Sequence, residues 1–152
     1  MALPNVFTET GIKELITRIN QLHENSQPLW GIMKLAQMLA HCNVTYEMIY
    51  TDTHKKPNFF IGWVLKTFVK SKVISETPYI KNGPTGPQFI VLREKKFEEE
   101  KKRLIGFIEK TQSLGEKHFN DLPSFSFGPL KSEEWNNMFY KHLDHHLRQF
   151  GV

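Results

Sequence analysis

Three of the chain's seven histidines lie near its C-terminal end, as His142, His145 and His146. His142 and His146 are four positions apart, and on a helix such residues point the same way, about 6 Å from each other. The pair can therefore chelate one divalent metal ion. The zinc-protease motif uses the same spacing, but no Glu follows the first histidine here, so protease chemistry is not implied. The alternative is a pair of core-edge histidines bonded to backbone or carboxylate groups.

A third metal ligand must come from another element, and His41 is the natural candidate because its segment is otherwise apolar on one side. Taken alone, His41 would be an ordinary core histidine. His145 lies about 100° around the helix from His146 and could replace either partner, but we expect it beside the site or at the surface. Imidazole ligands suit zinc and nickel. The sequence thus predicts zinc or nickel held by His41, His142 and His146, with coordination positions left for water or substrate.

Other candidate chemistry is weaker. The polar residues that could orient ligands or donate protons are Glu47, Asp52, Gln37 and Gln149, and no pattern selects one of them. A diiron carboxylate site is disfavoured because its Glu-x-x-His motif does not occur in the sequence. Cys42, which lies among apolar residues, is expected to pack in the core and not to act as a nucleophile.

The elements that must position these histidines are helices. Apolar residues at helical spacing predict a helix over Thr10–Leu22, with Thr8 or Thr10 as the N-cap, and a second from about Gly31 to Tyr50. The second helix carries His41 and turns Ile32, Leu35, Leu39, Cys42, Tyr46 and Ile49 inward.

Further helices are predicted after Tyr50. The aromatic run Phe59–Val69 is consistent with a short buried helix, with a strand as the alternative. Arg93–Leu114 predicts a long helix with Gly115 as its C-cap. Ser132 is the expected N-cap of a last helix that stops at Gly151. Pro/Gly-rich loops occupy 75–88 and 123–129, and the first should cover a site or pack along the helices. With no strand pairs in view, the fold class is all-α.

Length and composition define the class of protein. A chain of 152 residues with 39% apolar and 24% charged side chains predicts one folded domain over 1–152. No run approaches the roughly 18 apolar residues that cross a bilayer. No basic region followed by an apolar stretch opens the chain. The single cysteine suits a reducing compartment. We therefore expect a cytoplasmic protein without a membrane partner.

The net charge of +4 does not indicate a nucleic-acid partner, because basic residues alternate with acidic ones and no recognised nucleic-acid motif is present. The twelve Phe and three Trp are more than the inner helix faces need. Some could lie at a homodimer interface, where aromatics are enriched. The alternative, given equal weight, is that all of these aromatic side chains fill one thick core.

The C-terminal motif also resembles a known group. Trp135, followed by the run Tyr-Lys-His-Leu-Asp-His-His-Leu-Arg-Gln-Phe-Gly at 140–151, resembles the closing helix of the DinB-like superfamily. The Phe-Gly-Pro-Leu loop at 127–130 and the loop at 81–87 look like those of an uncharacterised branch. Relatives in this branch carry His-Pro shortly before the Phe-Gly, where this chain has Ser124-Phe125.

The resemblance implies a DinB-like four-helix bundle with a short extra helix and long Pro/Gly loops. It also implies a metal ion held by one histidine of the second helix and two of the last, which correspond to His41, His142 and His146. Superfamily members with known activity are metal-dependent transferases or isomerases acting on low-molecular-weight thiols. The expected function is therefore metal binding with transfer to a small thiol substrate, and the alternative is a non-catalytic metal- or ligand-binding or structural bundle.

Overall fold

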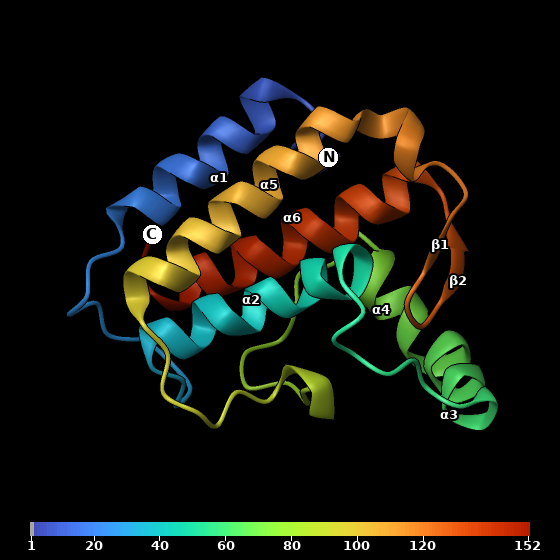
Figure 1. Ribbon diagram of the computed structural model, residues 1–152, viewed down its shortest axis with the longest axis horizontal. Coiled ribbons are helices and arrows are strands. Elements are labelled where there is room, and N and C mark those ends of the chain that lie inside the picture. The colour runs from blue at the N-terminus through green and yellow to red at the C-terminus, as the bar shows by residue number, and fades with distance from the viewer. Residues whose placement is uncertain (1) are drawn as a thin grey trace.

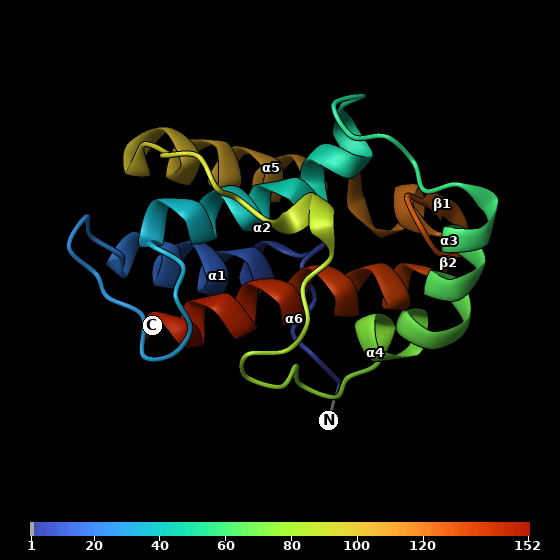
Figure 2. The same ribbon diagram turned by 90° about the horizontal axis from the view of Figure 1, so that it is seen from below.

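The computed structural model describes residues 2–152 and is mostly helical, with one small two-stranded sheet. This agrees with the predicted all-α class. Four long helices lie side by side (Figures 1 and 2): α1 (Glu9–Gln21), α2 (Leu35–Tyr50), α5 (Phe97–Phe119) and α6 (Ser132–Gln149). Helices α1 and α2 each pack against both α5 and α6, and α5 also contacts α6. No helix of the described residues is long and apolar enough to cross a membrane.

The core lies between these four helices and is built from the apolar positions that recur at helical spacing. Its fully buried side chains include Leu15, Ile19, Met38, Leu39, Leu104, Ile108, Trp135, Phe139, Leu143 and Leu147. Aromatic rings extend the core toward the hairpin end, where Phe119 meets Trp135 and Phe139 edge to face. Packing of these faces, not helix propensity alone, holds the long helices in place.

The two N-terminal helices begin where local capping allows. The Thr8 hydroxyl accepts a hydrogen bond from the Gly11 N–H at 3.2 Å, which confirms Thr8 as the N-cap of α1. Helix α2 begins at Leu35, later than the predicted Gly31. Gly31 has φ +78°, a left-handed conformation that an α-helix does not continue through. Ile32 follows it, and the prediction that Ile32 turns inward is wrong because the residue is 98% exposed.

Helix α6 also begins differently from the prediction. Lys131, not Ser132, is the N-cap residue, and its N–H donates to the Glu134 carboxylate at 2.8 Å. Ser132 is the first helical residue, and its hydroxyl donates to Glu116 at 3.0 Å. The C-terminal stop is as predicted, since Gly151 adopts φ +77° directly after the C-cap residue Phe150.

Helix α5 is longer than predicted at one end and shorter at the other. It begins at Phe97 instead of Arg93 and continues to Phe119. Gly115 does leave the helical conformation, with φ 75° and ψ 167°, but the chain resumes a helix after it. Gly115 is therefore a kink and not the predicted end of the helix.

The expectation of no strand pairs is wrong. Strands β1 (Leu122–Ser124) and β2 (Gly128–Leu130) form an antiparallel hairpin in which Leu122 pairs with Leu130 and Ser124 with Gly128. The Ser124 hydroxyl accepts the Phe127 N–H at 2.9 Å and so closes the turn. Three-residue strands are too short to show the alternating pattern that predicts a strand.

The aromatic segment after α2 is helical, but it is not buried. It comprises α3 (Phe59–Val64), a π-helical turn (Leu65–Val69) and α4 (Lys70–Ile74). None of the residues of these three elements is buried, and Phe59 is 91% exposed. Helix α4 packs on α6, where the buried Lys141 ammonium donates to the carbonyl oxygen of Lys72 at 2.7 Å. The prediction of a short buried helix is therefore wrong for its environment.

Candidate metal centre

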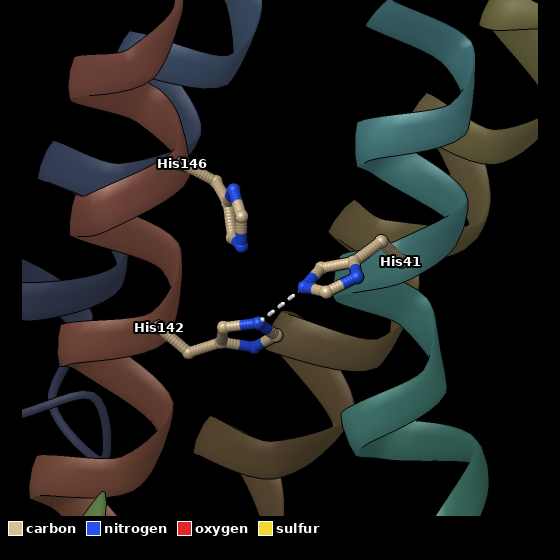
Figure 3. Close-up of side chains that lie close together, drawn as sticks. All are labelled: His41, His142 and His146. Atoms are coloured by element: carbon tan, nitrogen blue, oxygen red, sulfur yellow. Dashed lines mark hydrogen bonds between the residues drawn. The ribbon is translucent and has the colours of Figure 1, made fainter. Parts of the chain in front are cut away.

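Helices α2 and α6 bring the three predicted histidines together. His41 comes from α2, and His142 and His146 come from one face of α6. One ligand nitrogen from each of the three lies within 4.8 Å of the other two. Figure 3 shows the three rings pointing into one common space between the helices, with Nε2 of His41 2.9 Å from Nε2 of His142. A search of the described residues for three or more His, Cys, Asp or Glu side chains close enough to hold one metal ion finds these three histidines.

The ring of His41 is oriented by a backbone carbonyl. Its Nδ1 lies 2.9 Å from the Phe89 oxygen, which belongs to the short 3-10 helix Pro87–Phe89. A carbonyl oxygen can only accept, so Nδ1 of His41 carries the proton and donates it. In the neutral imidazole, Nε2 then keeps its lone pair, and this lone pair faces the other two histidines.

The ring of His146 is oriented by the side chain of Gln149. The carbonyl oxygen of Trp30 can only accept, and the Gln149 amide nitrogen donates to it at 2.8 Å. This contact fixes which end of the amide is oxygen. The Gln149 oxygen therefore accepts from Nδ1 of His146 at 2.8 Å. Nε2 of His146 is left unprotonated, as in His41.

The ring of His142 has a partner that can reverse its role. Nδ1 of His142 lies 2.9 Å from the Thr45 hydroxyl, which can donate or accept. Without a metal ion, Nε2–H of His142 donates to Nε2 of His41 while the Thr45 hydroxyl donates to Nδ1. With the other tautomer, Nδ1–H donates to Thr45 and Nε2 is free. Transfer of the proton from Nε2 to Nδ1, with rotation of the Thr45 hydroxyl from donor to acceptor, would therefore release the third lone pair.

Burial keeps the cluster uncharged. Desolvation lowers the pKa of His146 to about 3 and that of His142 well below its usual value. The pKa of His41 is also lowered, mainly by burial. In each case the neighbouring histidines add to the effect, because like charges would repel at this distance. Near pH 7 the three imidazoles are neutral, which is the protonation state that binds a metal ion.

Aromatic side chains from two loops surround the cluster. The Phe89 ring lies 5.3 Å from that of His41, and Tyr79 lies 5.7 Å from His145. Trp30 meets the other side of His145 at 5.9 Å. The 75–88 loop thus lies over the site, one of the two alternatives expected for it. His145 is half-buried at the edge of the cluster, and its ring is 5.0 Å from that of His146.

The structure separates the four polar candidates that the sequence could not rank. Only Gln149 contacts a histidine of the cluster. Gln37 accepts the Lys34 N–H at the start of α2, and Glu47 pairs with His54 and Arg103. Asp52 is exposed at the end of α2.

Sequence reasoning missed Thr45 and the Phe89 carbonyl. Thr45 is one helical turn after His41 and so shares its face, which is a signal that the spacing contained. The contribution of Phe89 is a backbone atom, and no residue pattern reveals it. Cys42 is buried, and its thiol, which lies in apolar surroundings, has a raised pKa. It belongs to the core, as expected, and does not join the cluster.

The donor set fits a metal ion with small adjustments. Zinc–imidazole bonds are about 2.0–2.1 Å long, so two nitrogens of a tetrahedral site are separated by about 3.3 Å. The pair at 2.9 Å would have to open by a few tenths of an ångström, and the third nitrogen is already within 4.8 Å of both. Three neutral histidines with fixed outer partners are the ligand set of many catalytic zinc sites.

Comparison with known proteins gives one match. No curated protein matches the chain, and no solved structure matches it. A family described as "Protein of unknown function (DUF1569)" matches residues 5–151, which include all three histidines of the cluster. The chain therefore belongs to the DUF1569 family.

Proposed function

We propose that this protein binds one divalent metal ion through Nε2 of His41, His142 and His146. The observation that carries the proposal is the orientation of the three rings. Each Nδ1 has its own hydrogen-bond partner on the far side of the ring, so that three Nε2 atoms converge. Metal-binding histidines nearly always have such outer partners, which fix the tautomer and raise the basicity of the ligand nitrogen.

Zinc or nickel is the ion that we propose, because both bind neutral imidazole well. A bound ion of this kind supplies Lewis acidity, which lowers the pKa of a coordinated thiol or water. Burial in the protein holds the three proposed ligands neutral, and the Phe89 ring packs against His41 while Tyr79 and Trp30 pack against the neighbouring His145. A site of this kind, taken together with the resemblance of the C-terminal motif to the DinB-like superfamily, supports a metal-dependent transferase acting on a low-molecular-weight thiol.

The fold assignment that goes with this function is a DinB-like four-helix bundle. In its support, one histidine lies on the second long helix and two lie four apart on the last, which is the distribution that the resemblance implies. Helix α3 with its continuation through α4 would be the short extra helix. We place the protein in the cytoplasm on the basis of its single cysteine.

The second candidate is a non-catalytic bundle in which the ion, or the histidine cluster itself, stabilises the fold. The direct contact between His41 and His142 favours it, since the hydrogen bond between their Nε2 atoms can by itself stabilise the cluster. The two candidates differ in the coordination shell. A catalytic site keeps an open position, whereas a structural site is closed.

The test is elemental analysis of the protein purified without a histidine tag. We expect about one zinc or nickel ion per chain in the wild type. His41→Ala, His142→Ala and His146→Ala should each lose it, and His23→Ala should retain it, because His23 is exposed and away from the cluster. Thiol substrates are then screened with the loaded protein, and cobalt substitution reports whether a coordination position exchanges with added thiol.

Failure to take up any divalent ion on reconstitution would reject the metal proposal and leave the cluster as a polar core. Metal uptake without turnover, and with a cobalt spectrum that added thiol does not change, would select the non-catalytic candidate. A homodimer is a separate proposal based on aromatic content, and light scattering of the same sample measures it.

A further inference from the structure

The segment from α3 to α4 presents large apolar side chains to solvent. Phe59 is 91% exposed, Phe60 69%, Trp63 52% and Phe68 60%. Three of these rings form one cluster, since Phe60 stacks on Trp63 at 6.3 Å and Trp63 meets Phe68 edge-on at 6.2 Å. We call Phe59, Phe60, Trp63 and Phe68 the aromatic patch. Contiguous exposed apolar surface of this kind marks an interaction site.

The patch lies where a large partner could reach it. Helix α3 makes its main contacts with the π-helical turn that follows it and not with the long helices. In both Figure 1 and Figure 2 it lies at the outer end of the molecule, beside the β1–β2 hairpin. The cluster of His41, His142 and His146 lies between α2 and α6, and the aromatic patch contains none of these residues.

The segment that carries the patch is basic. From Thr53 to Ser75 the chain has five lysines and neither Asp nor Glu. Lys70 pairs with Glu134 at 3.5 Å. The other four make no ion pair within residues 2–152, and all are exposed: Lys55, Lys56, Lys66 and Lys72. The partner of this surface must therefore combine an apolar layer with negative charge.

We propose that the aromatic patch and these four lysines bind an anionic lipid surface. Aromatic side chains insert into the boundary between headgroups and acyl chains, and lysines attract the phosphate groups. This proposal departs from the expectation of no membrane partner, which rested on the lack of a segment long and apolar enough to span a bilayer. Peripheral binding needs no such span, since an interfacial helix lies in the plane of the membrane.

Charge disfavours a second copy of the chain as the occupant. A two-fold dimer through this patch would set the lysines of both copies against one another, and lysine is depleted in the core of protein interfaces. Single-stranded nucleic acid is also disfavoured. Stacking of bases needs free ring faces, and the stack of Phe60 on Trp63 occupies one face of each of these two rings.

The experiment is co-sedimentation of the full chain with vesicles. One set consists of phosphatidylcholine alone, and the other is an equimolar mixture of phosphatidylcholine and phosphatidylglycerol. We expect binding to the mixed vesicles only, weakened by salt. The double variant Phe60→Ser/Trp63→Ser should reduce binding more than about tenfold. Lys55→Gln/Lys56→Gln should reduce it roughly fivefold for each lysine.

Two control variants separate this patch from general surface properties. Ile32→Ser removes a 98% exposed apolar side chain elsewhere, and Lys13→Gln/Lys102→Gln removes two exposed charges elsewhere. Both should bind as the wild type does. Circular dichroism of every variant checks that the fold is retained.

The proposal is overturned if the wild type does not bind the mixed vesicles, or if it binds phosphatidylcholine vesicles as strongly as mixed ones. It is also overturned if the patch variants bind mixed vesicles as strongly as the wild type does. It is also overturned if light scattering shows a dimer that Phe60→Ser/Trp63→Ser dissociates, which would assign the patch to a second copy. Binding to single-stranded DNA that the same variant abolishes, without vesicle binding, would assign it to nucleic acid. None of these outcomes depends on the metal content of the protein.

Discussion

The side-chain oxygen of Gln149 accepts a hydrogen bond from Nδ1 of His146 at 2.8 Å. The same amide donates to the Trp30 carbonyl oxygen, and the Gln149 backbone oxygen accepts the Leu29 N–H at 2.7 Å. Gly31 completes this junction, because a Cβ at that position would lie 2.7 Å from the Gln149 amide nitrogen. One residue therefore ties the loop before α2 to the orientation of a candidate metal ligand.

Replacement of Gln149 should weaken metal binding without touching a ligand atom. In Gln149→Leu the Nδ1–H of His146 loses its acceptor, so the ring is no longer held with Nε2 toward the cluster. Loss of such an outer partner typically costs 10–100-fold in metal affinity. Competition with a chromophoric chelator measures this ratio against the wild type.

Gln149→Glu is the matched variant for this prediction. A carboxylate keeps the acceptor for His146, so metal affinity should recover most of the loss, although the contact with Trp30 is lost. The cobalt spectrum of Gln149→Glu should resemble that of the wild type. If Gln149→Leu and Gln149→Glu weaken binding equally, Gln149 acts through the loop and not through the ring of His146.

Acid should destabilise the metal-free protein between pH 7 and pH 5. A buried histidine with a lowered pKa takes up its proton in the unfolded chain, near pH 6.5, but not in the folded one. The free energy of unfolding is therefore unaffected above about pH 7 and falls as the pH drops below 6.5. With a folded pKa of about 3, His146 alone costs about 2 kcal/mol at pH 5.

Urea unfolding of chelator-treated protein at several pH values tests this slope. The carboxyl group of Glu47, whose pKa is lowered by His54 and Arg103, contributes only below about pH 4.5, outside this range. His146→Gln should flatten the slope between pH 7 and pH 5. An unchanged slope in that variant would mean that His146 is protonated as readily in the folded protein as in the unfolded chain.

Cys42 should be inert in the folded protein. It is 1% exposed and its thiol has a raised pKa, so the reactive thiolate is scarce. A thiol reagent such as dithionitrobenzoate should react only when denaturant is added. Cys42→Ala should keep metal content unchanged and cost about 1–2 kcal/mol of stability from lost packing. Fast labelling of native protein would contradict this assignment.

Hydrophobic spacing predicted the long helices well because their cores follow it strictly. Ile12, Leu15 and Ile19 are buried on α1 as the pattern requires. The same rule fails at Ile32, since the left-handed Gly31 ends any helix there. The predicted burial also fails for Phe59–Val69, because the sequence of an aromatic run does not distinguish a segment packed in the core from one exposed at an interaction surface.

The three histidines could be selected from sequence because two share a helix face and the third lies in an apolar stretch. Their ring orientations could not. The acceptor of His41 is the carbonyl oxygen of Phe89, a residue in a Pro/Gly-rich loop 48 positions away. That loop has no periodicity, and its path depends on packing against α2. The three histidines that cluster could therefore be picked out from the sequence, whereas the hydrogen bonds that orient their rings depend on the tertiary structure.

Gly106 and Gly115 of α5 differ in backbone conformation but not in the free space around them. A Cβ at Gly106 or at Gly115 would meet no atom within 4 Å. Gly115 has φ +75°, whereas Gly106 lies within the regular helix before the kink. Gly115→Ala should therefore cost about 1–2 kcal/mol, because a side chain is strained in the left-handed region. Gly106→Ala should add roughly 0.5–1 kcal/mol, since alanine loses less backbone entropy in a helix.

Thermal unfolding of the two variants under identical conditions separates these effects, with expected shifts of about 2–4 °C per kcal/mol and of opposite sign. Both residues lie on the same helix and both changes add one methyl group, so general effects of composition cancel. If Gly115→Ala were as stable as the wild type, the helix would run straight through position 115. The turn that leads into the β1–β2 hairpin would then have to be set by the residues after Phe119.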